Sequence, residues 1–180
     1  MDALFTFFAE LMAEPWFKPG LVAAGIAMAT AGFGAGATEL GPWYRSLKQP
    51  RWKPPDWAFP VVWTSIFGLC TVAGVLAWMA ADTPGWQRCV LAMFLLNAVL
   101  NGLWSVLYFR WQRPDWSLIE VVALWLSVAA LVLGLWPLSP LASVLVLPYL
   151  VWVTIAGALN LATVRLNGPF EGRPRKEAAA

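Results

Sequence analysis

The chain has 180 residues, of which 60% are hydrophobic and 12% are charged, and its net charge is +2. A water-soluble fold cannot bury so much apolar surface, and the basic residues lie between apolar segments, so a soluble domain and a nucleic-acid partner are both excluded. The chain contains no histidine, which removes an imidazole base, haem ligand or zinc ligand, and we predict no catalytic residue, no metal site and no required cofactor.

The first segment, residues 1–19, has the pattern of an amphipathic helix. Within residues 2–17, Leu4, Phe7 and Leu11 recur at helical spacing, and acidic residues occupy the opposite side. Such a helix lies along the membrane surface, because its apolar face enters the headgroup zone while its charges stay in water.

The next segment, residues 20–40, has no charged residue before Glu39. Its length is sufficient to cross a hydrocarbon core of about 30 Å, so we predict the first membrane span here. Gly32 and Gly36 have GxxxG spacing, which predicts close approach of a neighbouring helix at these two positions.

The stretch from Trp43 to Thr64 reads WYRSLKQPRWKPPDWAFPVVWT and differs from the rest of the chain. Its four prolines prevent a continuous helix, so we predict an ordered loop. Its aromatic and basic residues are Trp43, Tyr44, Trp52, Trp57, Trp63, Arg45, Lys48, Arg51 and Lys53. Composition leaves two interpretations: an interfacial aromatic belt with a positive-inside loop, or the rim of a pocket for a flat, anionic, apolar ligand.

Two further spans are predicted at residues 57–81, with Asp56 as the helix cap, and at residues 87–109. In the second of these, Asn97 and Asn101 are four residues apart, and Trp104 follows on the same face. Amides at this depth need partners, so this face is predicted to point inward. Hydrogen bonding between helices and contact with a ligand both remain open.

The fourth span is predicted at residues 116–136 and the fifth at residues 141–166. Glu120 lies one turn into the fourth span, and we expect it to face headgroup water near the positive end of the helix dipole. On the fifth span, the spacing of four between Trp152, Ala156 and Asn160 marks another inward face. We therefore predict an all-α, integral membrane bundle of five helices over residues 20–167, with a disordered tail at residues 168–180.

The basic residues predict the orientation of these spans. If the N-terminus lies outside, ten lysines and arginines fall on the inner side and two, Lys18 and Arg88, on the outer side. The positive-inside rule then places the first loop and the C-terminus on the cytoplasmic side.

Three motifs carry a resemblance to a known family. The loop sequence given above, NGLWSVLYF in the third span and LPYLVWVTIAGALN in the fifth resemble the signatures of the translocator protein or tryptophan-rich sensory protein family, over about residues 25–167. The resemblance implies a five-helix bundle, usually a homodimer, with a pocket beneath the first loop for porphyrins, sterols and similar aromatic ligands. The pocket residues that it implies are Trp52, Pro54, Pro55, Trp63, Asn97, Asn101, Trp104, Trp116, Trp152, Ala156 and Leu159.

The chain departs from this family at the loop, where Gln49 precedes Pro50 and Asp56 follows the paired prolines. An anionic porphyrin would lose one favourable charge and gain an unfavourable one. The resemblance implies a membrane receptor or sensor for porphyrins. The alternatives are a tetrapyrrole or sterol transporter, and light- and oxygen-dependent porphyrin degradation in which indole rings donate electrons to the photoexcited ligand.

Overall fold

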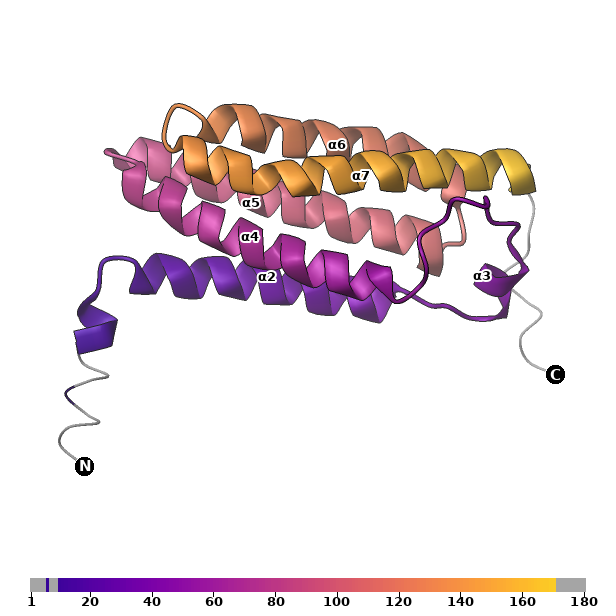
Figure 1. Cartoon of the computed structure of the whole chain (residues 1–180), viewed down its shortest axis with the longest axis horizontal. Helices are drawn as coiled ribbons and strands as arrows, with labels where there is room; N and C mark the ends of the chain where they lie inside the picture. The colour runs from indigo at the N-terminus through magenta and orange to yellow at the C-terminus, as the bar shows by residue number, and fades with distance from the viewer. Residues whose placement is uncertain (1–5, 7–9, 171–180) are drawn as a thin grey trace.

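The computed structural model describes residue 6 and residues 10–170. The long helices are α2 (Phe17–Ala37), α4 (Ala58–Ala80), α5 (Pro84–Ser105), α6 (Pro114–Leu135) and α7 (Pro140–Asn167). A short helix, α3 (Pro42–Ser46), lies in the first loop, and a π-helical segment, η1 (Val106–Arg110), continues α5 (Figure 1). The part of the chain that the structure describes has no strand, which confirms the predicted all-α class.

Local sequence explains where the later helices begin. Helices α5, α6 and α7 each start at a proline, whose fixed φ suits the first turn and whose missing N–H has no partner there anyway. Thr83 accepts a hydrogen bond from the backbone of Trp86 at 3.3 Å, and Ser139 accepts one from Ala142 at 3.2 Å. Two of the five helices therefore begin at a side-chain cap next to a proline.

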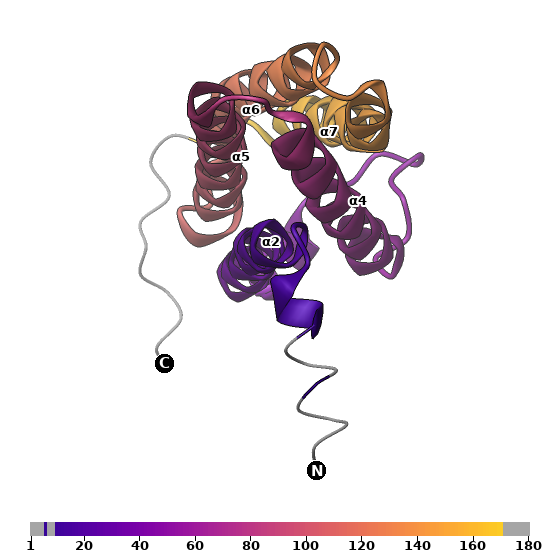
Figure 2. The ribbon, with the colours of Figure 1, turned by 90° about the vertical axis from the view of Figure 1, so that its left-hand side faces the viewer.

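The five long helices form a ring in which α2 contacts α4 and α5, α4 contacts α7, and α6 packs between α5 and α7. Figure 2 shows this ring from one end, with α2 on the opposite side from α6 and α7. All five helices are long and apolar enough to cross a membrane, the third including η1. The predicted number and order of spans are thus confirmed, and the protein is an integral, multi-pass membrane protein.

The first loop and the N-terminal segment differ in part from what the sequence predicts. The loop is not entirely irregular, because α3 forms before the first of its prolines, and Trp57 rather than Asp56 is the N-cap of α4. Most of the predicted amphipathic helix lies outside the described residues, although residues 10–13 are helical and the chain turns before α2 begins. The predicted disordered tail, residues 168–180, lies outside them from residue 171 onward, whereas Phe170 within its first three residues is buried.

Close helix packing occurs at a different glycine from those predicted. A Cβ at Gly32 or Gly36 would meet no atom within 4 Å, so no helix of the same chain approaches closely at these two positions. A Cβ at Gly102 would lie 3.0 Å from the ring of Phe33, so this glycine lets α2 approach α5. Ala98, one turn earlier on α5, lines a cavity between α2, α4 and α5, and the homodimer stays a prediction.

Candidate ligand-binding site

A cavity of about 490 Å³ lies beneath the first loop, between α2, α4, α5 and α7. We call it the loop-end cavity. Its wall includes five of the eleven predicted site residues: Trp63, Asn101, Trp104, Trp152 and Ala156. Its volume falls in the range of sites for small organic ligands, and most of its lining is apolar.

Indoles from three helices line this cavity, and they belong to two separate groups of aromatic rings. The ring of Trp63 on α4 lies 6.5 Å from Trp152 on α7, at 90°, and stacks on Phe67 at 5.5 Å. On α5, Trp104 stacks on Tyr108 at 5.1 Å. Edge-to-face and stacked pairs at these distances hold the rings in fixed orientations, so the cavity presents rigid aromatic walls.

The π-helical segment η1 explains how the end of α5 contributes to this wall. The wider turn places Tyr108 and Phe109 so that both rings contact Trp104, at centroid distances of 5.1 and 6.1 Å. Tyr108 is buried, whereas Phe109 lines the cavity. Single π-helical turns are frequent at functional sites, and this one adds a second aromatic ring beside Trp104.

Two polar side-chain groups belong to residues of the cavity wall, and only one of them has a hydrogen-bond partner in the described part of the chain. The amide of Asn101 donates to the Tyr149 hydroxyl at 3.0 Å, so part of its role is to join α5 to α7. The indole N–H of Trp152 is buried and has no hydrogen-bond partner in the described part of the chain, although Trp152 lines the cavity. Because this nitrogen is closed off from solvent, the indole must shift before the N–H can donate to an acceptor atom on a bound ligand.

The loop above the cavity is fastened at two points. The amide of Asn167 at the end of α7 accepts from the Lys48 backbone N–H at 2.7 Å and donates to the Lys48 carbonyl at 2.9 Å. Arg110 pairs with Glu39 at 2.6 Å and thereby connects η1 to the segment after α2. These contacts hold the loop over the cavity and were not predicted from sequence.

Two residues of opposite charge, Lys53 and Asp56, lie at the mouth of the loop-end cavity and neutralise each other. Asp56 lines the cavity and forms an ion pair with Lys53, whose ammonium also lies 5.4 Å from the ring of Tyr44. Partial burial opposes protonation of Lys53, but hydrogen bonds to Asp56 and Tyr44 outweigh it and raise the pKa of this ammonium above its ordinary value. The Lys53 ammonium is therefore already paired with Asp56 and is not free to pair with an anionic ligand.

The other six predicted site residues do not line this cavity. Trp52 is 54% exposed, and Trp116 packs on the surface against Trp111 and beneath the guanidinium of Arg113. Asn97 donates to Ser127 at 2.8 Å and lines a second cavity nearer the start of α2. The remaining three, Pro54, Pro55 and Leu159, are also absent from the wall, and their roles stay predictions.

Sequence reasoning missed the contribution of α2. Thr30, Gly34 and Thr38 line the loop-end cavity on one face of this helix, together with Ala31 and Ala35. The spacing of four between two threonines and a glycine, in a helix otherwise made of apolar residues, is a signal of an inward face that the composition of the span obscured.

Glu120 lies in a different environment from the predicted one. The side chain is 8% exposed, and neither carboxyl oxygen has a hydrogen-bond partner in the described part of the chain. Its helical face also carries Ser117, Val121 and Leu124, all buried. The expectation that Glu120 faces headgroup water is therefore wrong, because the rotation of α6 turns it toward the bundle.

Replacing Glu120 with methionine is expected to stabilise the protein by about 1–3 kcal/mol, because a buried polar group without partners is exchanged for an apolar side chain of similar length. The measurement is the thermal denaturation of both proteins in the same detergent. Glu120→Gln, which keeps an unpaired polar end, should give little of this gain. A lower melting temperature for Glu120→Met would show that the carboxyl makes a stabilising interaction.

Taken together, the structure defines a polytopic helical membrane protein whose five spans enclose an aromatic-walled cavity under a fastened first loop. The chain belongs to the TspO/MBR family, whose family model matches residues 20–166.

Three similar proteins illustrate the range of this family. The chain is 35% identical over 142 residues to Protein CrtK of Rhodobacter capsulatus, covering 79% of this chain and 89% of that protein. It is 38% identical over 125 residues to the tryptophan-rich sensory protein of Cereibacter sphaeroides, covering 69% and 77%. It is 29% identical over 170 residues to the translocator protein of Sus scrofa, covering 91% and 98%.

Proposed function

We propose that this protein binds flat, largely apolar ligands of the tetrapyrrole class in the loop-end cavity and acts as a membrane receptor or sensor for them. The observation that carries this proposal is the meeting of Trp63, Trp104 and Trp152, from three helices, around one cavity. Rigid aromatic walls match the face of a conjugated ring system, and the unpaired indole N–H of Trp152 offers one directional contact. The similarity to a protein named as sensory supports the regulatory role.

Titration of the purified protein with protoporphyrin IX, followed by tryptophan fluorescence, tests this proposal. We expect saturable quenching, which Trp152→Phe weakens by up to about 10-fold because a ring remains but the N–H donor is lost. Absence of saturable quenching, or quenching that Trp152→Phe leaves unchanged, would count against binding in this cavity.

Removing the negative charge at the mouth should strengthen porphyrin binding. In Asp56→Asn, the Lys53 ammonium loses its carboxylate partner and can pair with a carboxylate of the ligand. We therefore expect the affinity for protoporphyrin IX to rise by about 3- to 5-fold at low salt. The gain should shrink as salt is added. The matched control is Asp82→Asn, which removes an exposed carboxylate from the turn between α4 and α5, outside the cavity wall. An equal gain in both variants would assign the effect to net charge alone.

The hydrogen bonds between Asn167 and Lys48 hold the first loop closed, so we expect them to slow ligand dissociation. Asn167→Ala removes two hydrogen bonds to the Lys48 backbone, worth about 0.5–1.5 kcal/mol each, so the loop should open more often. We expect protoporphyrin IX to dissociate about 5-fold faster, as measured by stopped-flow fluorescence. Ser65→Ala, which alters an exposed hydroxyl on α4, is the control. Unchanged dissociation in Asn167→Ala would show that the loop does not limit release.

Transport of the ligand is a second candidate, and one observation favours it. Thr30 and Phe67 line both the loop-end cavity and the second cavity, so the two spaces adjoin inside the bundle. A wider side chain in Phe67→Trp should then slow protoporphyrin flux into liposomes that contain the protein. Flux equal to that of protein-free liposomes would exclude this function.

We propose the orientation that the basic residues predict, with the first loop and C-terminus on the cytoplasmic side. The structure supports one requirement of this proposal, because an odd number of spans separates the segment before α2 from the segment after α7. A reporter fused after Ala180 should behave as cytoplasmic. An extracytoplasmic signal would reverse the assignment.

A further inference from the structure

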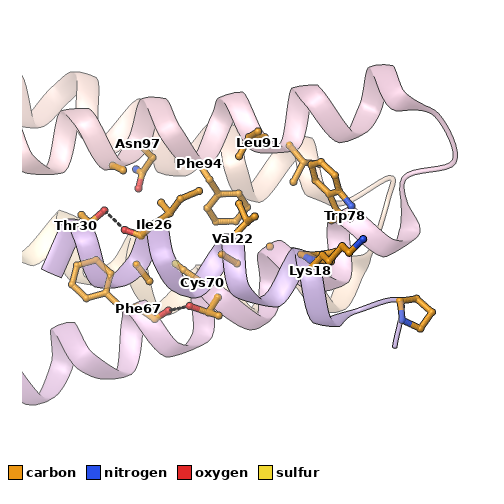
Figure 3. Close-up of a pocket in the computed structure, with 18 residues that line it drawn as sticks. Lys18, Val22, Ile26, Thr30, Phe67, Cys70, Trp78, Leu91, Phe94 and Asn97 are labelled. Atoms are coloured by element: carbon orange, nitrogen blue, oxygen red, sulfur yellow. Dashed lines mark hydrogen bonds between the residues drawn. The ribbon is translucent and has the colours of Figure 1, made fainter. Parts of the chain in front are cut away.

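A second cavity of about 420 Å³ lies between the first half of α2, the second half of α4 and the first half of α5. We call it the Lys18 cavity. Figure 3 shows that Lys18 and Trp78 lie at one end of it, while Thr30, Phe67 and Asn97 lie at the other. Apolar side chains fill the wall between these ends, among them Val22, Ile26, Cys70, Leu91 and Phe94.

The polar groups inside the Lys18 cavity are already committed to the protein. The Thr30 hydroxyl donates to the Ile26 carbonyl at 2.7 Å, and the Thr71 hydroxyl donates to the Phe67 carbonyl at 2.8 Å. The Asn97 amide donates to Ser127 at 2.8 Å. A ligand in the interior therefore meets a wall that is effectively hydrocarbon, which favours an apolar chain without polar substituents.

The mouth has the opposite character. Lys18 is the one charged residue on the described wall, its side chain is exposed, and it forms no ion pair with another described residue. Its ammonium is therefore available to an anion at the end of the cavity, unlike Lys53 at the loop-end cavity, which is paired with Asp56. Trp78 beside it carries an amphipathic ring of the kind that borders lipid headgroups.

The length of the cavity sets the size of the chain that it would hold. At 1.5 Å of helix rise per residue, Lys18 at the mouth and Thr30 at the inner end are separated by about 18 Å along α2, which is comparable with an extended acyl chain of the myristoyl class. The wall has few indoles, in contrast to the loop-end cavity, so a flexible chain fits it better than a flat ring.

We propose that the Lys18 cavity is a second ligand site, which takes a single acyl chain and holds the anionic head group of that chain at the Lys18 ammonium. The source of the chain is either a free long-chain carboxylate or one chain of an anionic membrane lipid. The proposal does not depend on porphyrin binding, because Lys18 and the apolar wall between it and Phe67 belong to the Lys18 cavity alone.

Equilibrium binding of radiolabelled myristate to the full chain in phosphatidylcholine nanodiscs tests this site. We expect saturable binding that Lys18→Glu weakens by about 5- to 10-fold and Lys18→Arg preserves, because an exposed charge pair is worth up to about 1 kcal/mol and reversal adds repulsion. Methyl myristate, which has no charge, should bind equally to the parent protein and to Lys18→Glu. Absence of saturable myristate binding, or equal binding to Lys18→Glu and Lys18→Arg, would overturn the proposal.

A second pair of variants tests the interior. Ala27→Phe places a ring in the cavity and should abolish myristate binding, whereas Ala29→Phe, on the exposed side of α2, should not. Protoporphyrin quenching should persist in Ala27→Phe, which separates failure of this site from failure of the loop-end cavity. If Ala27→Phe does not fold, the Lys18 variants still decide. Myristate binding that survives in folded Ala27→Phe would overturn the proposed location.

Competition identifies the source of the chain. If phosphatidylglycerol added to the nanodiscs displaces myristate and additional phosphatidylcholine does not, the site accepts an anionic membrane lipid. If only free carboxylates of similar length compete, the site is specific for fatty acids. Both results support an acyl chain with an anionic head, whereas equal displacement by phosphatidylcholine would contradict a role for the Lys18 charge.

Discussion

Replacing Ala156 with phenylalanine is expected to weaken protoporphyrin binding by about 100-fold. Ala156 is a small residue on the wall of the loop-end cavity, and a benzyl group there occupies space that a ring ligand needs. Forcing a ligand and an extra ring into one well-packed space costs about 3 kcal/mol, which corresponds to this loss. The measurement is quenching of tryptophan fluorescence by protoporphyrin IX.

The matched control is Ala158→Phe, two residues further along α7 on its exposed side. This variant adds the same ring to the lipid-facing surface and should bind protoporphyrin IX normally. Melting temperatures of both variants should stay near that of the parent protein, because the added ring enters an open cavity in one and the lipid in the other. Normal binding by folded Ala156→Phe would place the ligand elsewhere.

Replacing Trp63 with alanine is expected to weaken protoporphyrin binding by about 30-fold and to lower stability as well. The Trp63 ring contacts Phe67, Tyr149 and Trp152 at centroid distances of 5.5, 5.8 and 6.5 Å. Each such pair contributes about 0.5–1.5 kcal/mol beyond the area it buries, so the substitution removes one wall of the cavity and loosens the remaining rings.

Trp57→Ala is the control, since Trp57 is 70% exposed and does not line the cavity. Both residues belong to the same tryptophan-rich stretch, and they differ in whether the indole faces the cavity or the surroundings. Binding measured by isothermal titration should separate them clearly. An equal loss in the two variants would favour the interfacial aromatic belt over a binding cavity.

Sequence pattern predicted the membrane spans well because their signal is local. Apolar runs of sufficient length, interrupted by proline-containing turns, determine where a helix can cross a bilayer, and each observed span matches a predicted one within four residues at its ends. The inward faces of α5 and α7 were also predictable, because Asn101 and Trp152 share a helical face with other residues that line the cavity.

The features that sequence did not give depend on helix rotation and on contacts between distant segments. The position of Glu120 near the start of α6 does not indicate whether its side chain faces the lipid or the bundle. The GxxxG spacing of Gly32 and Gly36 does not indicate whether another helix of the chain lies against that face of α2. The contact between Asn167 and Lys48 joins residues 119 positions apart, so no local pattern marks it. Similarly, the motif that contains Trp52 predicted a loop, but only the packed structure turns this indole outward.

The most direct test of the central claim is an experimental structure of the full chain with bound protoporphyrin IX. The account predicts ring density in the loop-end cavity, in contact with Trp63, Trp104 and Trp152 and beneath the loop that Asn167 fastens. Density for the ring on the lipid-facing surface of the bundle, with these three indoles untouched, would contradict it.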